Sequence, residues 1–351
     1  MELIEILTTA TDNHAADIFI VTGAPLSYKA YGKLFRINDA QLSSADTGRL
    51  VCDIFKLAGL KYGEDNMPES ELDFSLSVAG MGRFRVNVYK QRGSYAAVLR
   101  YVPFELPESS ALGIPDQVMK LSECKSGIVL VTGAASNGKS TTLSCIINRI
   151  NSTRCGHIIT IEDPIEFLHR HDKCIVSQRE IEIDTGSYLD ALRAALRQSP
   201  DVILLGEMRD YETISVAMTA AETGQLVLST LHTLGAANTI DRIIDVFPMN
   251  QQHQIRIQLS MVLNAVVSQQ LLPSTDERLV PAFEIMTMNS AIRTLIREEK
   301  THQIDTIIQS SAGMQTMDSC ITQMYRDGII SAQTAIDYAY NQDIMRKRIG
   351  A

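Results

Sequence analysis

The sequence has no long apolar run and no basic start. Its apolar stretches fall well short of the ~20 residues that a bilayer-spanning helix requires. The chain begins Met1-Glu2-Leu3-Ile4-Glu5, which is acidic and unlike a secretory signal. We therefore expect a cytoplasmic protein whose association with a membrane is peripheral.

Cysteine is sparse and never closely paired. The six cysteines are scattered, and none forms a C-x-x-C motif. A zinc site needs paired ligands, and a secreted disulfide framework would be denser, so we expect no zinc and reduced, mostly structural thiols. The residues are Cys52, Cys124, Cys145, Cys155, Cys174 and Cys320.

An excess of positive charge is also missing. The formal net charge is −9, so we expect no broad nucleic-acid-binding surface, although a local basic channel stays open as an alternative. The 351 residues, of which 45% are hydrophobic and 21% charged, fit an ordinary globular chain with room for two domains. We find no internal repeat or low-complexity tract.

Residues 1–102 predict a small α+β domain. Residues 17–21 read as a strand that runs into a turn. The segments 74–78 and 83–89 alternate with period two on either side of a Gly-containing turn, which predicts a hairpin. A further strand is expected at 96–101.

The organisation changes after a Pro-rich polar linker that we place at 103–114. Between 115 and 288 strands and helices alternate, which is typical of a parallel α/β sheet. From 289 to 351 the sequence predicts helices and a charged tail. The strands expected in the α/β region are 127–132, 157–161, 201–205 and 225–229.

A phosphate-binding loop follows the strand at 127–132. It reads Gly133-Ala134-Ala135-Ser136-Asn137-Gly138-Lys139-Ser140-Thr141 and matches G-x-x-x-x-G-K-[ST]. Backbone N–H groups of such a loop surround an anion at the positive end of the next helix. Lys139 then reaches the β- and γ-phosphates, and the Ser140 hydroxyl binds Mg²⁺. The sequence therefore predicts that the chain binds a nucleoside triphosphate.

Three carboxylates follow the strand at 157–161. They are Glu162, Asp163 and Glu166, with Pro164 ending the strand abruptly. Ligands of open α/β sheets bind at this end of the strands, where a carboxylate can polarise the attacking water or hold Mg²⁺ through water. The alternative is a solvated acidic turn.

Glu207 follows another apolar strand, at 201–205. An apolar strand that ends in an acid is the Walker B pattern, and Gly206 lets the backbone approach the phosphates closely. The alternative is a core strand with an exposed end.

His232 follows the fourth strand in the sequence Ser229-Thr230-Leu231-His232-Thr233. A hydroxyl and an imidazole in this place can sense the γ-phosphate through hydrogen bonds. A structural histidine is the alternative, and without the neighbouring motifs we would favour it.

Several arginines precede the linker. Arg83 and Arg85 alternate on one strand and should share a face, with Arg92 and Arg100 nearby. In oligomeric ATPases such residues reach a neighbour's nucleotide and stabilise transition-state charge. The alternative is a solvated basic face.

Together these motifs resemble those of the secretion-superfamily hexameric ATPases. The segment 161–166 resembles the Asp box of that family, 206–210 its atypical Walker B motif and 229–233 its His box, and 241–248 also fits. The resemblance extends over nearly the whole chain, from the strand at 17–21 to residues 313–318.

Within the superfamily the chain is most similar to the type IV pilus retraction ATPases. Residues 291–298 resemble the Ala-Ile-Arg-Asn-Leu-Ile-Arg-Glu motif associated with retraction, which accessory paralogues tend to lose. Extension ATPases usually carry an extra N-terminal domain and a tetracysteine zinc motif, and neither is expected here.

The resemblance implies the architecture and the partners. It predicts an α/β fold with a RecA-like P-loop ATPase domain and a parallel sheet, a small PAS-like α+β domain before it, and C-terminal helices after it. It also implies a homohexamer that hydrolyses ATP with Mg²⁺. The hexamer would work at the inner face of the cytoplasmic membrane, where it would drive pilin removal through a platform protein.

The resemblance implies roles for individual residues. Lys139, Glu166, Glu207 and His232 would be catalytic, with Glu166 activating the attacking water. Ser140 would bind Mg²⁺ directly and Glu207 through water, supported by Glu162 and Asp163. The nucleotide would also contact Arg83, Arg85 and Arg100.

The sequence departs from the family at two places. Relatives commonly have Gly-Pro-Thr-Gly-Ser-Gly-Lys-Ser-Thr in the phosphate loop, whereas residues 134–137 differ here. Asn137 tolerates left-handed backbone geometry, so we expect it to fit the loop without strain. Ser126 stands where relatives often have a basic residue, with Lys125 beside it.

Three other functions stay open. The chain could be an extension or type II secretion assembly ATPase, which has the same fold. It could be a nucleic-acid motor of the RecA class, which the acidic charge balance disfavours. It could also be a regulator that binds ATP in its altered loop without hydrolysing it.

Overall fold

A computed structural model of the chain divides into two units, Met1–Glu105 and Leu106–Ala351, and each is described by itself. Of the predicted linker, residues 103–105 lie outside the described part of the chain. The described residues are 2–30, 33–63, 66–102, 106–276 and 278–350.

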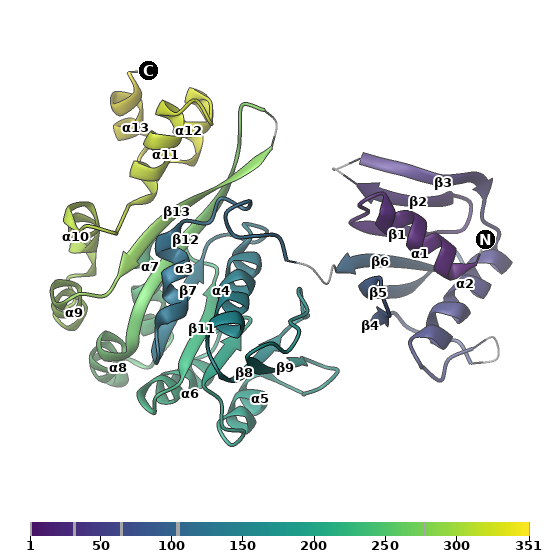
Figure 1. The fold of residues 1–351 in the computed structure, drawn as a ribbon, viewed down its shortest axis with the longest axis horizontal. Helices are drawn as coiled ribbons and strands as arrows, with labels where there is room; N and C mark the ends of the chain where they lie inside the picture. Colours follow the sequence, from purple (N-terminus) through teal and green to yellow (C-terminus); the bar gives the residue numbers. More distant parts are fainter. Residues whose placement is uncertain (1, 31–32, 64–65, 103–105, 277, 351) are drawn as a thin grey trace. The chain divides into compact units, whose positions relative to one another are not determined.

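The N-terminal unit is an antiparallel sheet with helices on one face (Figure 1). Apolar and polar residues alternate along β5, so one face of the sheet is buried and the other is not. Phe84 and Val86 are fully buried, while Arg83 and Arg85 point the other way. Helices α1 (Leu3–Asp12) and α2 (Ser44–Leu57) cover the buried side. The six strands lie in the order β3 (Lys33–Gln41), β2 (Pro25–Ala30), β1 (Asp17–Ile20), β6 (Ser94–Val102), β5 (Gly82–Gln91) and β4 (Leu72–Val78).

The predicted strands of this unit are confirmed, including the hairpin of β4 and β5. Strands β2 and β3 were not predicted. β3 is the edge strand and all nine of its residues are exposed or half-buried, so its sequence shows no alternation between apolar and polar residues.

The second unit is built on a seven-stranded sheet. Five neighbouring strand pairs are parallel, and β13 joins the edge antiparallel to β12. The predicted α/β fold is confirmed, with the sheet mixed instead of wholly parallel. The strands lie in the order β13 (Leu279–Thr287), β12 (Leu263–Pro273), β7 (Gly127–Thr132), β11 (Leu226–Leu231), β10 (Val202–Leu205), β8 (Gly156–Glu162) and β9 (Cys174–Glu180).

Helices cover both faces of this sheet, which explains its continuous apolar strands. Along β7, Ile128 and Leu130 pack toward one helical layer, whereas Val129 and Val131 pack toward the other. The second layer holds α3 (Asp116–Met119), the 3₁₀ turn η1 (Lys120–Glu123) and α4 (Lys139–Thr153). The first layer holds α5 (Tyr188–Ala195), α6 (Tyr211–Glu222), α7 (Ala236–Asp245), α8 (Met249–Val262), α9 (Ser290–Arg297), η2 (Thr301–Gln303) and α10 (Ile304–Ser310).

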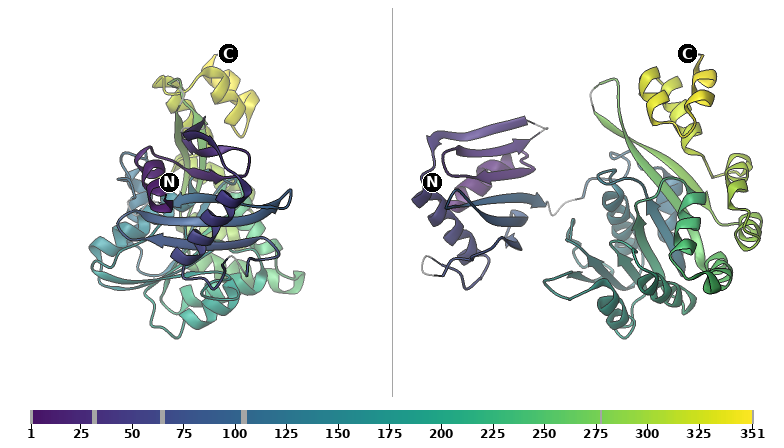
Figure 2. Two further views of the ribbon diagram at one scale, coloured as in Figure 1. Left: turned by 90° about the vertical axis from the view of Figure 1, so that its right-hand side faces the viewer. Right: turned by 180° about the vertical axis from the view of Figure 1, so that it is seen from behind.

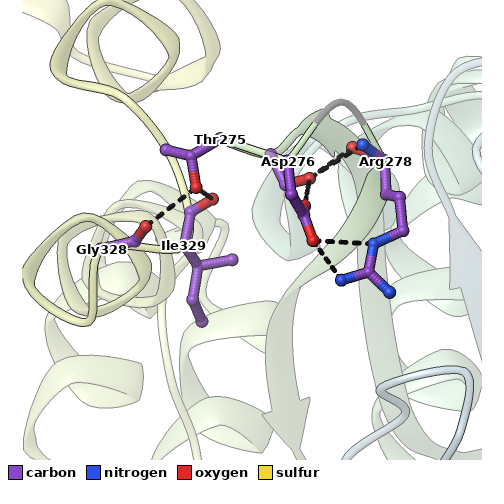
Figure 3. A network of polar contacts seen from close by, with 6 residues as sticks. Thr275, Asp276, Arg278, Gly328 and Ile329 are labelled. Atoms are coloured by element: carbon purple, nitrogen blue, oxygen red, sulfur yellow. Dashed lines mark hydrogen bonds and ion pairs between the residues drawn. The ribbon is translucent and has the colours of Figure 1, made fainter.

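The last helices form a separate cluster on the β12–β13 hairpin (Figure 2). Leu272 and Ala282 of the hairpin are buried against Met317 and Ile321 of this cluster. At the hairpin tip, the Thr275 backbone N–H donates to the Ile329 carbonyl at 2.9 Å, and its hydroxyl donates to Gly328 (Figure 3). The helices are α11 (Met317–Arg326), α12 (Ala332–Tyr338) and α13 (Gln342–Ile349).

The four strands predicted in this unit are confirmed, whereas β9, β12 and β13 were missed. β12 begins at Leu263, directly after α8 ends at Val262, so no turn residues mark the boundary. In β9 the apolar Ile175 is 63% exposed, and polar residues follow the buried Val176, which hides the strand pattern. Among the described helices, none combines the length and the apolar character needed to cross a bilayer.

Candidate active site

The phosphate loop joins the end of β7 to the start of α4. Gly133 and Gly138 have φ values of 142° and 75°, which favour glycine. A Cβ on Gly133 would lie 2.2 Å from the backbone oxygen of Gln269 on β12, so any side chain there would displace the loop. Gln269 also accepts a hydrogen bond at 2.7 Å from the Thr142 hydroxyl of α4. Both ends of the loop therefore rest on β12.

The middle of the loop contains one left-handed residue other than glycine. Ser136 has a φ of 63°, whereas Asn137 is not among the residues with a positive φ. Asn137 accepts a hydrogen bond from the Leu271 backbone N–H at 3.3 Å. The amide therefore ties the loop to β12, and the neighbouring serine makes the bend.

Lys139 lies inside the loop and is only 7% exposed. Its Nζ donates to the carbonyls of Gly133 at 2.9 Å and Ala134 at 2.8 Å. Burial lowers the pKa of this amine, while the nearby carboxylates of Glu166 and Glu207 act in the opposite direction. The ammonium thus lies where phosphate oxygens could replace the two carbonyls as its acceptors.

A cavity of about 450 Å³ brings the predicted motifs together. It lies at the carboxyl ends of β8, β10 and β11, where ligands of open α/β sheets bind. Gly133 and Ala134 are not among its lining residues, and their carbonyls accept the hydrogen bonds of Lys139. The lining residues are Ala135, Ser136, Asn137, Gly138, Lys139, Ser140, Glu162, Asp163, Pro164, Glu166, Tyr188, Gly206, Glu207, Arg209, Thr230 and His232.

Glu162, the last residue of β8, and Glu166, four residues further on, have different environments. Glu162 is 7% exposed and accepts a hydrogen bond from the Thr160 hydroxyl at 2.7 Å. Burial raises the pKa of Glu162 to about 7, against the effect of this hydrogen bond. Glu166 is exposed on the cavity wall. Only Glu166 is therefore placed to meet a water molecule freely.

Glu207 lies between Arg209 and His232. Its Oε2 lies 2.7 Å from Arg209 Nε and 3.6 Å from His232 Nε2. The hydrogen bond to Glu207 raises the pKa of the Arg209 guanidinium. A Cβ on Gly206 would lie 2.7 Å from the Tyr188 hydroxyl, so the glycine leaves room for that ring. The carboxylate and the imidazole of two predicted motifs are thus in direct contact.

Three residues of this site, Arg209, Tyr188 and Gln269, were not assigned roles from the sequence. Arg209 stands inside a recognised motif. The Thr230 hydroxyl, which was predicted to sense the γ-phosphate, donates to the Gly206 carbonyl at 2.5 Å. Tyr188 and Gln269 lie in segments with no motif, so nothing local marks them. Gln269 meets the loop across 127 residues of sequence, a contact that short patterns do not reveal.

Thr141 faces a second cavity, of about 520 Å³. This cavity lies on the far side of Gly138 and has an apolar wall made by Leu112, Leu271 and Pro281. Arg278, at the tip of the β12–β13 hairpin, lies at the same cavity and is ion-paired with Asp276 (Figure 3).

The predicted arginines lie in the N-terminal unit. Arg83 and Arg85 share the exposed face of β5, as expected from their spacing, and Arg85 is opposite Arg100 of β6. Arg100 is bound to Asp17 through a 2.9 Å contact. Arg92 lies in the turn between the two strands. Contact of these residues with nucleotide stays a prediction.

The Mg²⁺ prediction fits the donors in the first cavity. Within the described part of the chain, no group of three or more His, Cys, Asp or Glu side chains is arranged to hold a metal. Mg²⁺ at nucleotide sites does not need such a group, because phosphates and water supply most of its ligands. The Ser140 hydroxyl and the Glu207 carboxylate line one cavity, as that arrangement requires.

Comparison with known proteins shows the family of the chain. The family model of type II/IV secretion system proteins matches residues 2–280. The chain belongs to this family. It is 43% identical to the type IV pilus retractation ATPase PilT of Pseudomonas aeruginosa, with 97% of this chain and 98% of the relative covered. It is 44% identical to a twitching motility protein of Neisseria gonorrhoeae, with 90% and 85% covered.

A solved structure of the family has the same fold. The crystal structure of the pilus retraction motor PilT with bound ADP is 44% identical, covers 99% of each chain and has a TM-score of 0.91. The predicted family and fold class are confirmed, as is the prediction of an ATPase related to the pilus retraction enzymes. The roles of individual site residues stay predictions.

Proposed function

We propose that this chain is the subunit of an ATP-driven motor that retracts type IV pili. One observation carries the proposal: the phosphate loop, two acidic strand ends and His232 line one cavity, in a chain similar over nearly its full length to a pilus retraction ATPase. A site that only binds nucleotide would not need a water-activating carboxylate such as Glu166 beside the loop.

The phosphates of ATP would bind the loop between Gly133 and Thr141. Lys139 would exchange its two carbonyl acceptors for β- and γ-phosphate oxygens, as its short contacts suggest. Ser140 would hold Mg²⁺ directly and Glu207 through water, with Glu162 and Asp163 supporting. The ion, when bound, neutralises charge on the phosphates.

The nucleobase would enter the second cavity. Its apolar wall suits a flat ring, and the cavity is continuous with the loop through Gly138 and Thr141. With the phosphates in one cavity and the base in the other, the N-terminal end of α4 would lie between the two parts of the ligand. The positive end of the helix would then face the phosphates.

Glu166 would activate the attacking water. It is exposed on the cavity wall, and Lys139 lies near enough to feel its charge. Glu162 is a poorer base for this step, because burial keeps it protonated up to about pH 7. His232 would report the γ-phosphate state to Glu207, which it approaches at 3.6 Å.

The working assembly would be a homohexamer at the inner face of the cytoplasmic membrane. Arg83, Arg85 and Arg100 would contact a nucleotide in the assembled ring, in the same subunit or in the next. Hydrolysis would change the relative positions of the domains, and the ring would drive pilin removal through an inner-membrane platform protein.

Pilus length and twitching in a deletion strain test the biological role. We expect excess pili that do not retract, with motility restored by the wild-type gene. Absent pili would instead identify an extension ATPase, which was the principal alternative.

Purified Glu166→Gln tests the chemistry. We expect about a 10²–10⁴-fold loss of phosphate release with ATP binding retained, because a general base contributes that much. Glu222→Gln, an exposed carboxylate at the end of α6, is the matched control. Loss of ATP binding in Glu166→Gln would reassign the residue to ligand binding.

A further inference from the structure

A buried serine on β12 joins three parts of the ATPase unit. Ser268 is fully buried, and its Oγ lies 2.8 Å from the hydroxyl of Thr132, the residue immediately before Gly133. The same oxygen accepts a hydrogen bond from the Gly235 backbone N–H at 3.2 Å. It is also hydrogen-bonded to the side chain of Tyr340, between α12 and α13. One oxygen thus links the phosphate loop, the turn after His232 and the C-terminal helices.

A buried glutamate on the neighbouring strand makes a second link. Glu284 of β13 is 1% exposed, and its Oε1 accepts from the Ala236 N–H at 2.7 Å. Its Oε2 accepts from the Met317 N–H at 3.3 Å. The carboxylate therefore binds the first turns of α7 and α11 at once, and each is the positive end of a helix.

The turn after His232 lies against this junction. Gly235 has a φ of 87°, and a Cβ on it would lie 3.6 Å from the Tyr340 ring and 3.9 Å from Glu284 Oε1. The Tyr340 backbone N–H is in turn held by Asp318 of α11 at 2.8 Å. The C-terminal helices therefore contact the turn directly, three residues beyond His232.

The hairpin that carries Ser268 and Glu284 is attached to the same helices at its tip. Thr275 binds the backbone of Gly328 and Ile329, between α11 and α12 (Figure 3). A displacement of the helical cluster would therefore act on β12 and β13 at two places, the tip and the junction beside the phosphate loop. Packed interfaces of this kind transmit small shifts because they cannot deform smoothly.

We propose that Ser268, Glu284 and Tyr340 are positioning residues for ATP hydrolysis, through which helices α11–α13 hold the phosphate loop and the His232 turn in their working geometry. This inference rests on the proposed ATPase function. None of the three lines the ATP cavity, so their effect is on the placement of Lys139 and His232 and not on contact with ATP.

The proposal predicts a separation of turnover from affinity. We expect Ser268→Ala and Glu284→Gln each to lower kcat about tenfold, since displacing reacting groups by even a fraction of an ångström slows a reaction strongly. The Kd for a fluorescent ADP analogue should change less than about twofold, because the loop contacts to phosphate are retained.

Tyr340→Phe keeps the experiment decisive if the buried variants fail to fold. Tyr340 is 42% exposed, so loss of its hydroxyl leaves the packing of the ring unchanged. We expect about a threefold lower kcat, as fits the loss of one neutral hydrogen bond. Tyr338→Phe is the matched control and should behave as wild type, because the contact of Tyr338 with β12 is made by its backbone carbonyl, which accepts from Gln270 at 3.4 Å and is kept in the variant.

Hydrogen exchange separates this proposal from the proposed function. Backbone amides of residues 233–240 should exchange faster in Tyr340→Phe than in Tyr338→Phe, whether or not the wild type hydrolyses ATP. Wild-type exchange there, or a wild-type kcat in folded Tyr340→Phe and Glu284→Gln, would contradict the proposed positioning role. Absence of turnover in the wild type itself would contradict the proposed ATPase function. The exchange result would then test the positioning role alone.

Discussion

The two sheets of this molecule expose their polar side chains in different places. The antiparallel sheet of the N-terminal unit buries one face and presents the other, where Arg83 and Arg85 lie on β5. The sheet of the second unit is covered on both faces, so polar groups meet solvent mainly at the strand ends. A reaction that needs several converging side chains is therefore favoured at the strand ends of the second unit. The broad exposed face of the N-terminal sheet is better suited to contact with another surface.

The charged residues of the two units also differ in how far they are buried. At the strand ends of the second unit, one lysine is nearly enclosed among acidic groups, and burial shifts the pKa values of Lys139 and Glu162. On the N-terminal sheet the arginines are accessible to solvent, and Arg100 forms an ion pair with Asp17. We therefore expect substitutions at the edge to affect turnover most.

Of the three substitutions that test this comparison, Lys139→Ala should have the largest effect. Turnover should fall about 10²–10³-fold, since a charged donor aimed at the transferring group is lost. ATP affinity should fall as well, and the fold should persist. Phosphate release and nucleotide titration of the purified protein measure both, with the exposed Lys120→Ala as control. Turnover within a few-fold of wild type would mean that the catalytic centre does not lie at the carboxyl ends of the parallel strands.

A smaller effect concerns pH and the buried Glu162. Its pKa is raised by burial from 4.5 to about 7, so the folded protein binds this proton more tightly than the unfolded chain does. The free energy of unfolding should therefore decline as pH rises through this interval, by about 3 kcal/mol from this group. Denaturant unfolding without nucleotide at pH 5 and pH 8 measures this. Between the two pH values, the free energy of unfolding should fall by this amount more in wild type than in Glu162→Gln. An equal pH response in both proteins would contradict it.

The smallest effect is expected on the N-terminal sheet. Arg85→Ala should lower turnover of the assembled protein about tenfold, the size of one lost charged hydrogen bond, and leave the melting temperature unchanged. Ser43→Ala is the matched control, because Ser43 caps α2 through the Asp46 N–H at 3.2 Å. It should cost about 1 kcal/mol of stability and leave turnover intact. Equal turnover in both variants would assign the arginine face a purely structural role.

Much of the site could be predicted because its motifs are short and stand at the ends of apolar strands. The phosphate loop, Glu207 and His232 each follow a strand whose composition marks it, and parallel strand ends must meet at one edge. Glu166 was predicted with them, and it lines the same cavity. Local pattern and sheet geometry were enough for these residues.

The remaining features depend on contacts between distant segments. Gln269 supports the phosphate loop from a strand that begins without a turn after α8, so neither the strand nor its role could be read locally. Glu284 is a buried acid in an otherwise apolar strand, which a pattern cannot distinguish from an exposed one. The tolerance of Asn137 for left-handed geometry follows from its residue type, but neither the left-handed bend at Ser136 nor the hydrogen bond from Leu271 to Asn137 could be predicted locally.

The way the phosphate loop rests on β12 has a consequence for how such sequences can diverge. Gly133 and Gly138 are fixed by the backbone and side chain of Gln269, whereas Ala134, Ala135 and Ser136 are exposed. Mutations can therefore accumulate in the exposed part without loosening the loop from its strand. A search pattern written around the usual middle residues would pass over this chain, while one built on the two glycines and their distant glutamine would find it.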